Sequence, residues 1–155
     1  MRVYIDESGI NEHLQRGNAR AIKGEMVYGS ISGTRFCRES FIAALSQSRI
    51  LAPFCYTGTC DTSLFNIWLK QVLVPELKQG QVVILDNASF HKSKTSIEII
   101  EKAGCEILFL PPYSPDLNPI EKFWANFKRG VREILNTCSS LAEAIDKSFL
   151  SFCKT

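Results

Sequence analysis

The sequence predicts an open α/β domain in which a mixed sheet is flanked by helices, and three observations support this prediction. Residues 3–5 and 82–85 are apolar, β-branched runs typical of strands buried on both faces, and each is followed at once by an aspartate. Residues 82–110 follow the order strand, helix, strand, which predicts two parallel strands. Residues 26–56 carry alternating or apolar runs typical of an antiparallel hairpin or meander.

In the first half of the chain, residues 2–6 are expected to form a strand and residues 7–25 a polar loop. The meander that follows contains apolar runs at residues 27–31, 41–45 and 50–54, and we expect it to lie antiparallel to the first strand. Pro53 predicts that its strand is at an edge or bulged. Residues 61–63 supply N-cap choices for a helix that extends to about Val74.

In the second half, residues 82–86 are the second acid-bearing strand. Residues 93–103 are expected to form a helix that Gly104 ends, and residues 106–110 form the next strand. A stiff proline-rich loop follows at residues 111–115. Asn118 is then expected to cap a helix with Pro119 in its first position, extending to about Leu135. Residues 139–152 form the last predicted helix.

Length and composition predict a single domain that spans residues 1–155. The chain is 45% apolar and 22% charged, which is ordinary for a globular protein. We find no run of about 18 apolar residues and no secretory signal, so the sequence favours a cytoplasmic protein without a membrane partner. The six cysteines form no C-x-x-C pair, so reduced core thiols are favoured over disulfides or zinc. A net charge of +2 is only weak support for a nucleic-acid partner.

Three acidic residues are the candidates for a functional site. Asp6 and Asp86 each end a predicted strand, and Glu121 follows Asp86 with 34 residues between them. Ligands of open α/β sheets gather at the carboxyl ends of strands, where parallel neighbours would place both aspartates. The first turn of the helix after the proline-rich loop can point to the same place. Because buried carboxylates are costly without a cation, the three acids together predict a hard divalent metal and phosphate chemistry.

Each acid also has a structural interpretation that the sequence leaves open. An aspartate at a strand end, such as Asp6, often only caps a turn, and Asp86 can begin an Asx turn. With Asn118 as the N-cap, Glu121 is the third helical residue, so the pair resembles a capping box. The combination of the three is better support for a metal site than any one of them.

Basic residues on the helix after Asn118 are candidates for DNA contact. Glu121 lies beside the apolar stripe of this helix, on a flank with Lys128 and Arg132, while Lys122 and Arg129 are close to it. This face is either a solvated surface or a row that follows phosphates, and the sequence does not decide between them. The apolar stripe consists of Ile120, Phe123, Trp124, Phe127, Val131 and Ile134.

His91 and Lys92, shortly after Asp86, are the other candidates for DNA contact. His91 could orient a water, contact a phosphate or cap a turn. Metal ligation is less favoured, because hard cations prefer oxygen ligands.

The segments around the acids resemble those of a known family. Residues 85–88 (Leu-Asp-Asn-Ala) with His91, and residues 110–121 (Leu-Pro-Pro-Tyr-Ser-Pro-Asp-Leu-Asn-Pro-Ile-Glu) with Trp124, are similar to transposases of bacterial insertion sequences related to mariner. The acid triad of that family has the same gap before its terminal glutamate. Residues 6–9 look like its shorter first-acid motif. The resemblance extends from Asp6 to about Arg132.

This resemblance implies a ribonuclease-H-like fold, a mixed sheet flanked by helices, and a cut-and-paste DNA transposase that cuts element ends and transfers strands. It implies catalytic and metal-binding roles for Asp6, Asp86 and Glu121, with two Mg²⁺ or Mn²⁺ ions in each active site. The expected partners are the DNA of element ends and targets, and a second copy of the chain. The expected location is the bacterial cytosol, in association with the nucleoid.

One departure from the family gives an alternative. Family members usually carry helix-turn-helix modules before the catalytic domain, whereas the first strand here starts at residue 2. A separate or frameshift-fused reading frame would then supply that module, or the chain is a catalytically silent remnant that binds DNA or dimerises with a full transposase. A nuclease that acts on RNA–DNA hybrids is a further alternative, which the proline-rich segment disfavours.

Overall fold

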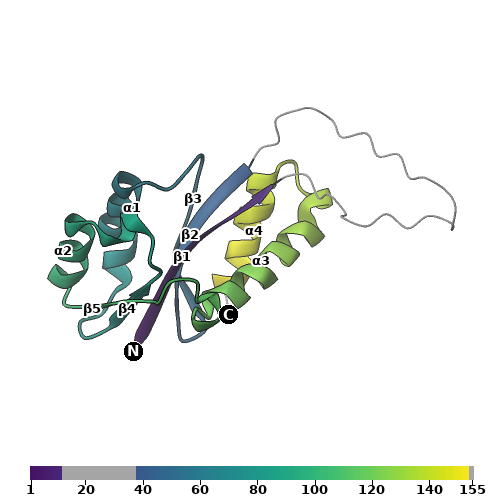
Figure 1. The fold of residues 1–155 in the computed structure, drawn as a ribbon. Coiled ribbons are helices and arrows are strands. Elements are labelled where there is room, and N and C mark those ends of the chain that lie inside the picture. The colour runs from purple at the N-terminus through teal and green to yellow at the C-terminus, as the bar shows by residue number, and fades with distance from the viewer. Residues whose placement is uncertain (12–37, 154–155) are drawn as a thin grey trace, which may run out of the picture.

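The computed structural model describes residues 1–11 and 38–153, which form a five-stranded mixed sheet covered by helices on both faces (Figure 1). The sheet order is β3-β2-β1-β4-β5. β1 pairs with β2 and β2 with β3 in antiparallel fashion, and β4–β5 is parallel, as the sequence predicts. β1 and β4 are also parallel neighbours, which is the condition for Asp6 and Asp86 to lie at the same edge. The strands are β1 (Arg2–Asn11), β2 (Arg38–Ser46), β3 (Arg49–Tyr56), β4 (Val82–Leu85) and β5 (Glu106–Phe109).

β1 is longer than the sequence predicts. The expected loop from residue 7 is wrong for residues 7–11, because these residues pair with β2, from Glu7 opposite Ile42 to Asn11 opposite Arg38. The parallel ladder between β1 and β4 reaches only to Tyr4. Asp6 therefore lies inside β1, just beyond its parallel pairing, and not at a strand end. The rest of the predicted loop and the run at residues 27–31 lie outside the described residues.

β3 is an edge strand, as Pro53 predicts, and its pairing with β2 shifts in register between Ile42 and Ala44. Ala52, which precedes the proline, has a φ of 52°. Its N–H donates to Glu76 Oε1 at 2.9 Å, and its carbonyl accepts from Trp68 Nε1 at 2.9 Å. These two bonds attach the irregular edge to the helical layer beside it.

α1 (Thr62–Trp68) and α2 (Lys94–Lys102) cover one face of the sheet. Asp61 caps α1 as predicted, but the α-helix does not reach Val74 as a regular element. It continues as a π-helical turn and then a 3-10 turn that contains Pro75, a residue with no N–H to donate. Ser93 caps α2, and Gly104 ends it with a φ of +78°.

α3 (Ile120–Ile134) and α4 (Leu141–Cys153) cover the opposite face (Figure 1). The predicted stripe of α3 is its buried face, with Ile120, Trp124, Phe127 and Val131 fully buried. The Trp124 ring lies 4.9 Å from that of Phe41 on β2. Two cores result, one on each side of the sheet, and they hold the strands that carry the acids between two rigid layers.

Of the described cysteines only Cys105 is buried, so the predicted core setting holds for that residue alone. Cys55, Cys60, Cys105, Cys138 and Cys153 are all free, and Cys37 lies outside the described residues. Within residues 1–11 and 38–153, no helix is long and apolar enough to cross a membrane.

Candidate active site

Asp6, Asp86 and Glu121 line one cavity of about 360 Å³, although they come from three separate parts of the fold. β1 supplies Asp6, the end of β4 is followed by Asp86, and the first turn of α3 supplies Glu121. The rest of the lining comes from residues 87–88 and from the proline-rich loop between β5 and α3. The structure thus brings together the three acids that the sequence singles out.

Asp6 is the most buried of the three acids, with 9% of its surface exposed. Burial and the nearby charges of Glu121 and Glu7 raise the pKa of this carboxyl to about 8. Asp86 adds to the same effect. Asp6 is therefore a carboxyl whose negative charge is poorly compensated by the protein.

Asp86 has the opposite electrostatic character. Its Oδ1 accepts a hydrogen bond from His91 Nδ1 at 2.6 Å and one from the Ala88 N–H at 3.0 Å. The bond from His91 is the main reason why the pKa of Asp86 lies below its ordinary value. The Ala88 bond is the Asx turn that the sequence allows. Since both bonds go to Oδ1, Oδ2 has no hydrogen-bond partner among the described residues.

Glu121 does not form the capping box that the sequence allows. In that motif its side chain would accept from the Asn118 N–H, but this group donates to the Pro115 carbonyl at 2.9 Å. The N-cap of α3 is Pro119 and not the predicted Asn118, whose own oxygens accept from the Glu121 N–H at 3.1 Å and from the Ile120 N–H at 3.4 Å. The Glu121 carboxylate is thus left to face the cavity.

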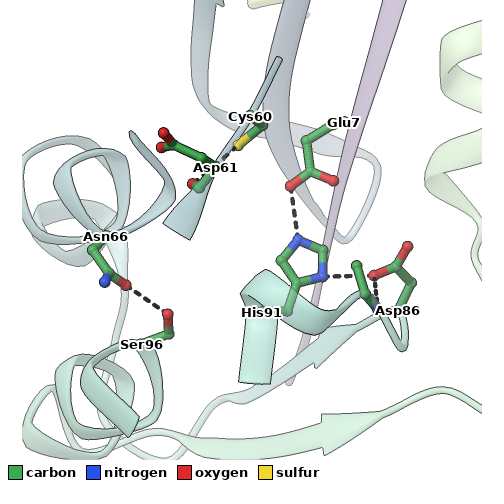
Figure 2. A network of polar contacts seen from close by, with 8 residues as sticks. Glu7, Cys60, Asp61, Asn66, Asp86, His91 and Ser96 are labelled. Carbon is green, nitrogen blue, oxygen red and sulfur yellow. Dashed lines mark hydrogen bonds and ion pairs between the residues drawn. The ribbon is translucent and has the colours of Figure 1, made fainter. Parts of the chain in front are cut away.

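His91 is fully buried and bridges two carboxylates (Figure 2). Its Nδ1 lies 2.6 Å from Asp86 Oδ1 and its Nε2 lies 2.8 Å from Glu7 Oε1. Burial lowers the pKa of His91, but the bonds to Asp86 and Glu7 outweigh burial and raise it to about 9. Ionised carboxylates only accept, so both ring nitrogens donate. The predicted DNA contact does not agree with this environment, because His91 has no exposed surface and no free nitrogen.

Glu7 is the site residue that sequence reasoning missed. Side chains alternate across a strand, so Glu7 lies on the same face of β1 as the buried Val3 and Ile5, opposite to Asp6. An acid in register with two core residues is the signal that could have identified it. Its partner could not have been identified in this way, because Glu7 and His91 are 84 positions apart in the sequence.

The basic candidates for DNA contact differ in their surroundings. Burial lowers the pKa of Lys128, and the charges that act on it include Glu121, Arg132, Arg38 and Asp6. Lys128 therefore lies near Glu121 and Asp6, and its other charged neighbours are Arg132 and Arg38 of β2, which the sequence did not indicate. Two other candidates have different surroundings. The Arg129 guanidinium donates to Asn126, and the Lys92 ammonium lies 5.7 Å from the centre of the Phe109 ring. Lys122 is exposed.

The donor set at the cavity fits a hard divalent cation. All three acids offer carboxylate oxygens, which Mg²⁺ and Mn²⁺ prefer, and the poorly compensated Asp6 is the group that a cation would stabilise most. In residues 1–11 and 38–153 no three acidic, histidine or cysteine side chains are close enough together to hold an ion as they stand. A bound cation would offset the repulsion by neighbouring acids that raises the pKa of Asp6.

Comparison with known proteins identifies the family of the chain. The family described as DDE superfamily endonuclease matches residues 1–142. The chain is 29% identical over 111 residues to the Transposable element Tcb2 transposase of Caenorhabditis briggsae. That alignment covers 70% of the chain but spans only about a third, 36%, of the relative. The family match supports the DDE superfamily that the sequence resemblance implied. It does not support the narrower assignment to bacterial insertion sequences, and this relative comes from a nematode.

Two solved structures show the same fold at low sequence identity. The Mos1 Strand Transfer Complex has a TM-score of 0.67 and 17% identity, with 99% of this chain and 55% of that chain covered. The catalytic core domain of BIV integrase has a TM-score of 0.58 and 11% identity, with 97% and 81% covered. The predicted ribonuclease-H-like sheet is thereby confirmed. Because the family match spans nearly the whole chain, this protein belongs to the DDE superfamily endonucleases.

Proposed function

We propose that this chain is the catalytic domain of a cut-and-paste DNA transposase, which hydrolyses phosphodiester bonds and transfers strands at element ends. One observation carries the proposal: three carboxylates from β1, from the end of β4 and from α3 line a single cavity in a member of an endonuclease superfamily. The names of the similar proteins support the choice of substrate. Tcb2 is a transposase, and two of the similar Mos1 structures are a strand transfer complex and a paired-end complex with a transposon end.

In this proposal Asp6, Asp86 and Glu121 hold two Mg²⁺ or Mn²⁺ ions. When bound, such ions activate the attacking water or 3′ hydroxyl and stabilise the leaving oxygen. Support comes from the donor chemistry of the cavity and from a similar Mos1 structure that is named as a complex with Mn, at 18% identity and a TM-score of 0.59. The protein itself contributes positions and charge, which is most of what phosphoryl transfer requires.

We propose that Lys128 and Arg132, with Arg38, guide the DNA backbone into this cavity. Lys128 is coupled electrostatically to Glu121 and Asp6, and Arg132 and Arg38 are coupled to Lys128, which supports this assignment. Lys122, exposed on the first turn of α3, could extend the same path, whereas Lys92 and Arg129 have other partners within the chain. Phosphate contacts of this kind position DNA without reading its sequence. We further propose that the domain acts as a homodimer on two DNA ends and belongs to an insertion sequence.

Nicking of supercoiled DNA tests the proposal. We expect the wild type to nick in Mn²⁺ or Mg²⁺ and to stop when the metal is chelated, and we expect Asp86→Ala to be inactive. Asp146→Ala, which removes an exposed acid on α4, is the matched control and should nick as the wild type does. If folded wild type and Asp86→Ala are equally inactive while DNA still binds in a salt-dependent manner, a catalytically silent DNA-binding protein replaces the proposal.

A further inference from the structure

Hydrogen bonds from His91 to Asp86 and to Glu7 connect β4 to β1 beyond the end of their backbone ladder. The parallel ladder of β1 and β4 ends at Tyr4 and Ile84, so Asp6 and Asp86 both lie beyond the last paired residues. Glu7 is the covalent neighbour of Asp6, and it bonds to His91 Nε2 at 2.8 Å. His91 Nδ1 in turn bonds to Asp86 at 2.6 Å. The imidazole therefore spans the gap between the two strands (Figure 2).

The surroundings of His91 hold its ring in one orientation. The short helix Ser89–Lys92 places it directly after the Asp86 turn. The rings of Phe90 and Phe65 lie 4.3 Å and 4.5 Å from the imidazole, centre to centre. The ring is fully buried, so it cannot rotate toward solvent without disturbing this aromatic cluster. A donor that is held so firmly dictates the orientation of the carboxylate that accepts from it.

We propose that His91 is a positioning residue that orients the Asp86 carboxylate toward the cavity. In this proposal Glu7, on the neighbouring strand β1, holds His91 in place through its bond to Nε2. The inference rests on the proposed function and assigns roles to two residues that do not face the cavity themselves. His91 and the Ala88 N–H both occupy Oδ1 of Asp86, so Oδ2 is the oxygen left for a cation. Groups that orient a ligand in this way typically contribute 10- to 100-fold to metal affinity.

Two substitutions separate the two ends of the bridge. In His91→Asn, the side-chain amide lies near the position of Nδ1 of the wild-type imidazole and can still donate to Asp86. In His91→Gln, the longer side chain places the amide near the position of the wild-type Nε2, so it can donate to Glu7 but not to Asp86. Both variants bury a neutral amide at the same position, so their effects on packing and solvation are similar. If His91 only filled space, the two variants would bind metal equally well.

The experiment is a Mn²⁺ titration of the full chain without DNA, followed by the electron paramagnetic resonance signal of free Mn²⁺. We expect His91→Gln to weaken Mn²⁺ binding by about 10- to 100-fold and His91→Asn to retain clearly more of the affinity. Glu7→Ala should fall between the wild type and His91→Gln. Ser96→Ala is the control, because Ser96 is equally buried and bonds to Asn66 rather than to either acid. Circular dichroism establishes that each variant is folded.

The outcomes distinguish this inference from the proposed function. If Asp86→Ala loses Mn²⁺ binding while both His91 variants bind as the wild type does, the metal site stands and the positioning role is overturned. Equal losses in His91→Asn and His91→Gln would also overturn it, since the loss would not depend on the bond to Asp86. If the wild type and Asp86→Ala bind Mn²⁺ identically, the metal site itself fails, and the inference fails with it.

Discussion

Asp6 and Glu121 face the same cavity from β1 and α3, and after burial the charge of Glu121 is the strongest influence that raises the pKa of Asp6. The raised value of about 8 means that the metal-free domain holds a proton on Asp6 at neutral pH. A cation that binds there has to displace this proton. The relationship therefore links metal binding, pH and stability through one carboxyl.

The first prediction concerns the stability of the metal-free domain. The folded-state pKa of Asp6 lies above its unfolded value near 4, so the folded state binds more protons between pH 4 and 8, and stability falls as pH rises through that range. Asp6→Asn removes this penalty. Since the pKa of Asp6 is raised from 3.8 to about 8, at about 1.4 kcal/mol per pKa unit, we expect a gain in the free energy of unfolding of up to about 5 kcal/mol at pH 8, which vanishes toward pH 4.

Thermal unfolding in a chelator, measured from pH 4 to pH 8.5, checks this prediction. Asp146→Asn is the control and should follow the wild-type curve in parallel. If the difference between Asp6→Asn and the wild type stays constant over this range, Asp6 does not titrate as described.

The second prediction concerns His91, whose folded-state pKa of about 9 lies above its ordinary value of 6.5. Its bonds to Asp86 and Glu7 therefore contribute stability that is fully present below pH 6.5 and is lost as pH rises through 9. We expect the free energy of unfolding of the wild type, relative to His91→Gln, to fall over this window. Denaturant titrations at pH 6, 7.5 and 9 measure this difference, and a difference that does not change with pH would contradict the charged bridge.

The third prediction concerns the DNA path. Lys128→Ala and Arg132→Ala should each weaken binding to duplex DNA of any sequence and reduce the slope of log affinity against log salt by about 1. Arg129→Ala on the same helix is the matched control, since this guanidinium already donates to Asn126. Fluorescence anisotropy at several salt concentrations measures the slopes. Equal slopes for Lys128→Ala, Arg132→Ala and the control would contradict the proposed phosphate contacts of Lys128 and Arg132.

Sequence reasoning identified those parts of the fold that local chemistry determines. Continuous apolar runs and the strand-helix-strand order were enough to predict the parallel pairing of β4 and β5. The apolar stripe was enough to predict the buried face of α3. Asp6 and Asp86 could be singled out because each directly follows an apolar run, and Glu121 because it stands at a helix start that the sequence marks. Their convergence on one cavity follows from the sheet order.

Sequence reasoning failed where contacts between distant segments decide the structure. The length of β1 depends on its pairing with β2, because residues 7–11 are too polar to mark a strand on their own. The bridge from Glu7 to His91 depends on the aromatic cluster that buries the imidazole. The capping box of Glu121 was a reasonable local reading, but the Asn118 N–H is taken by the turn at Pro115.

Anomalous diffraction from Mn²⁺-soaked crystals of the wild-type domain tests the central claim most directly. The account predicts an anomalous peak in the cavity, bound by carboxylate oxygens of Asp6 and Asp86 with Glu121 close by, and no such peak in Asp86→Ala. Mn²⁺ bound elsewhere, with this cavity empty at a concentration that supports nicking, would contradict the assignment of the three acids.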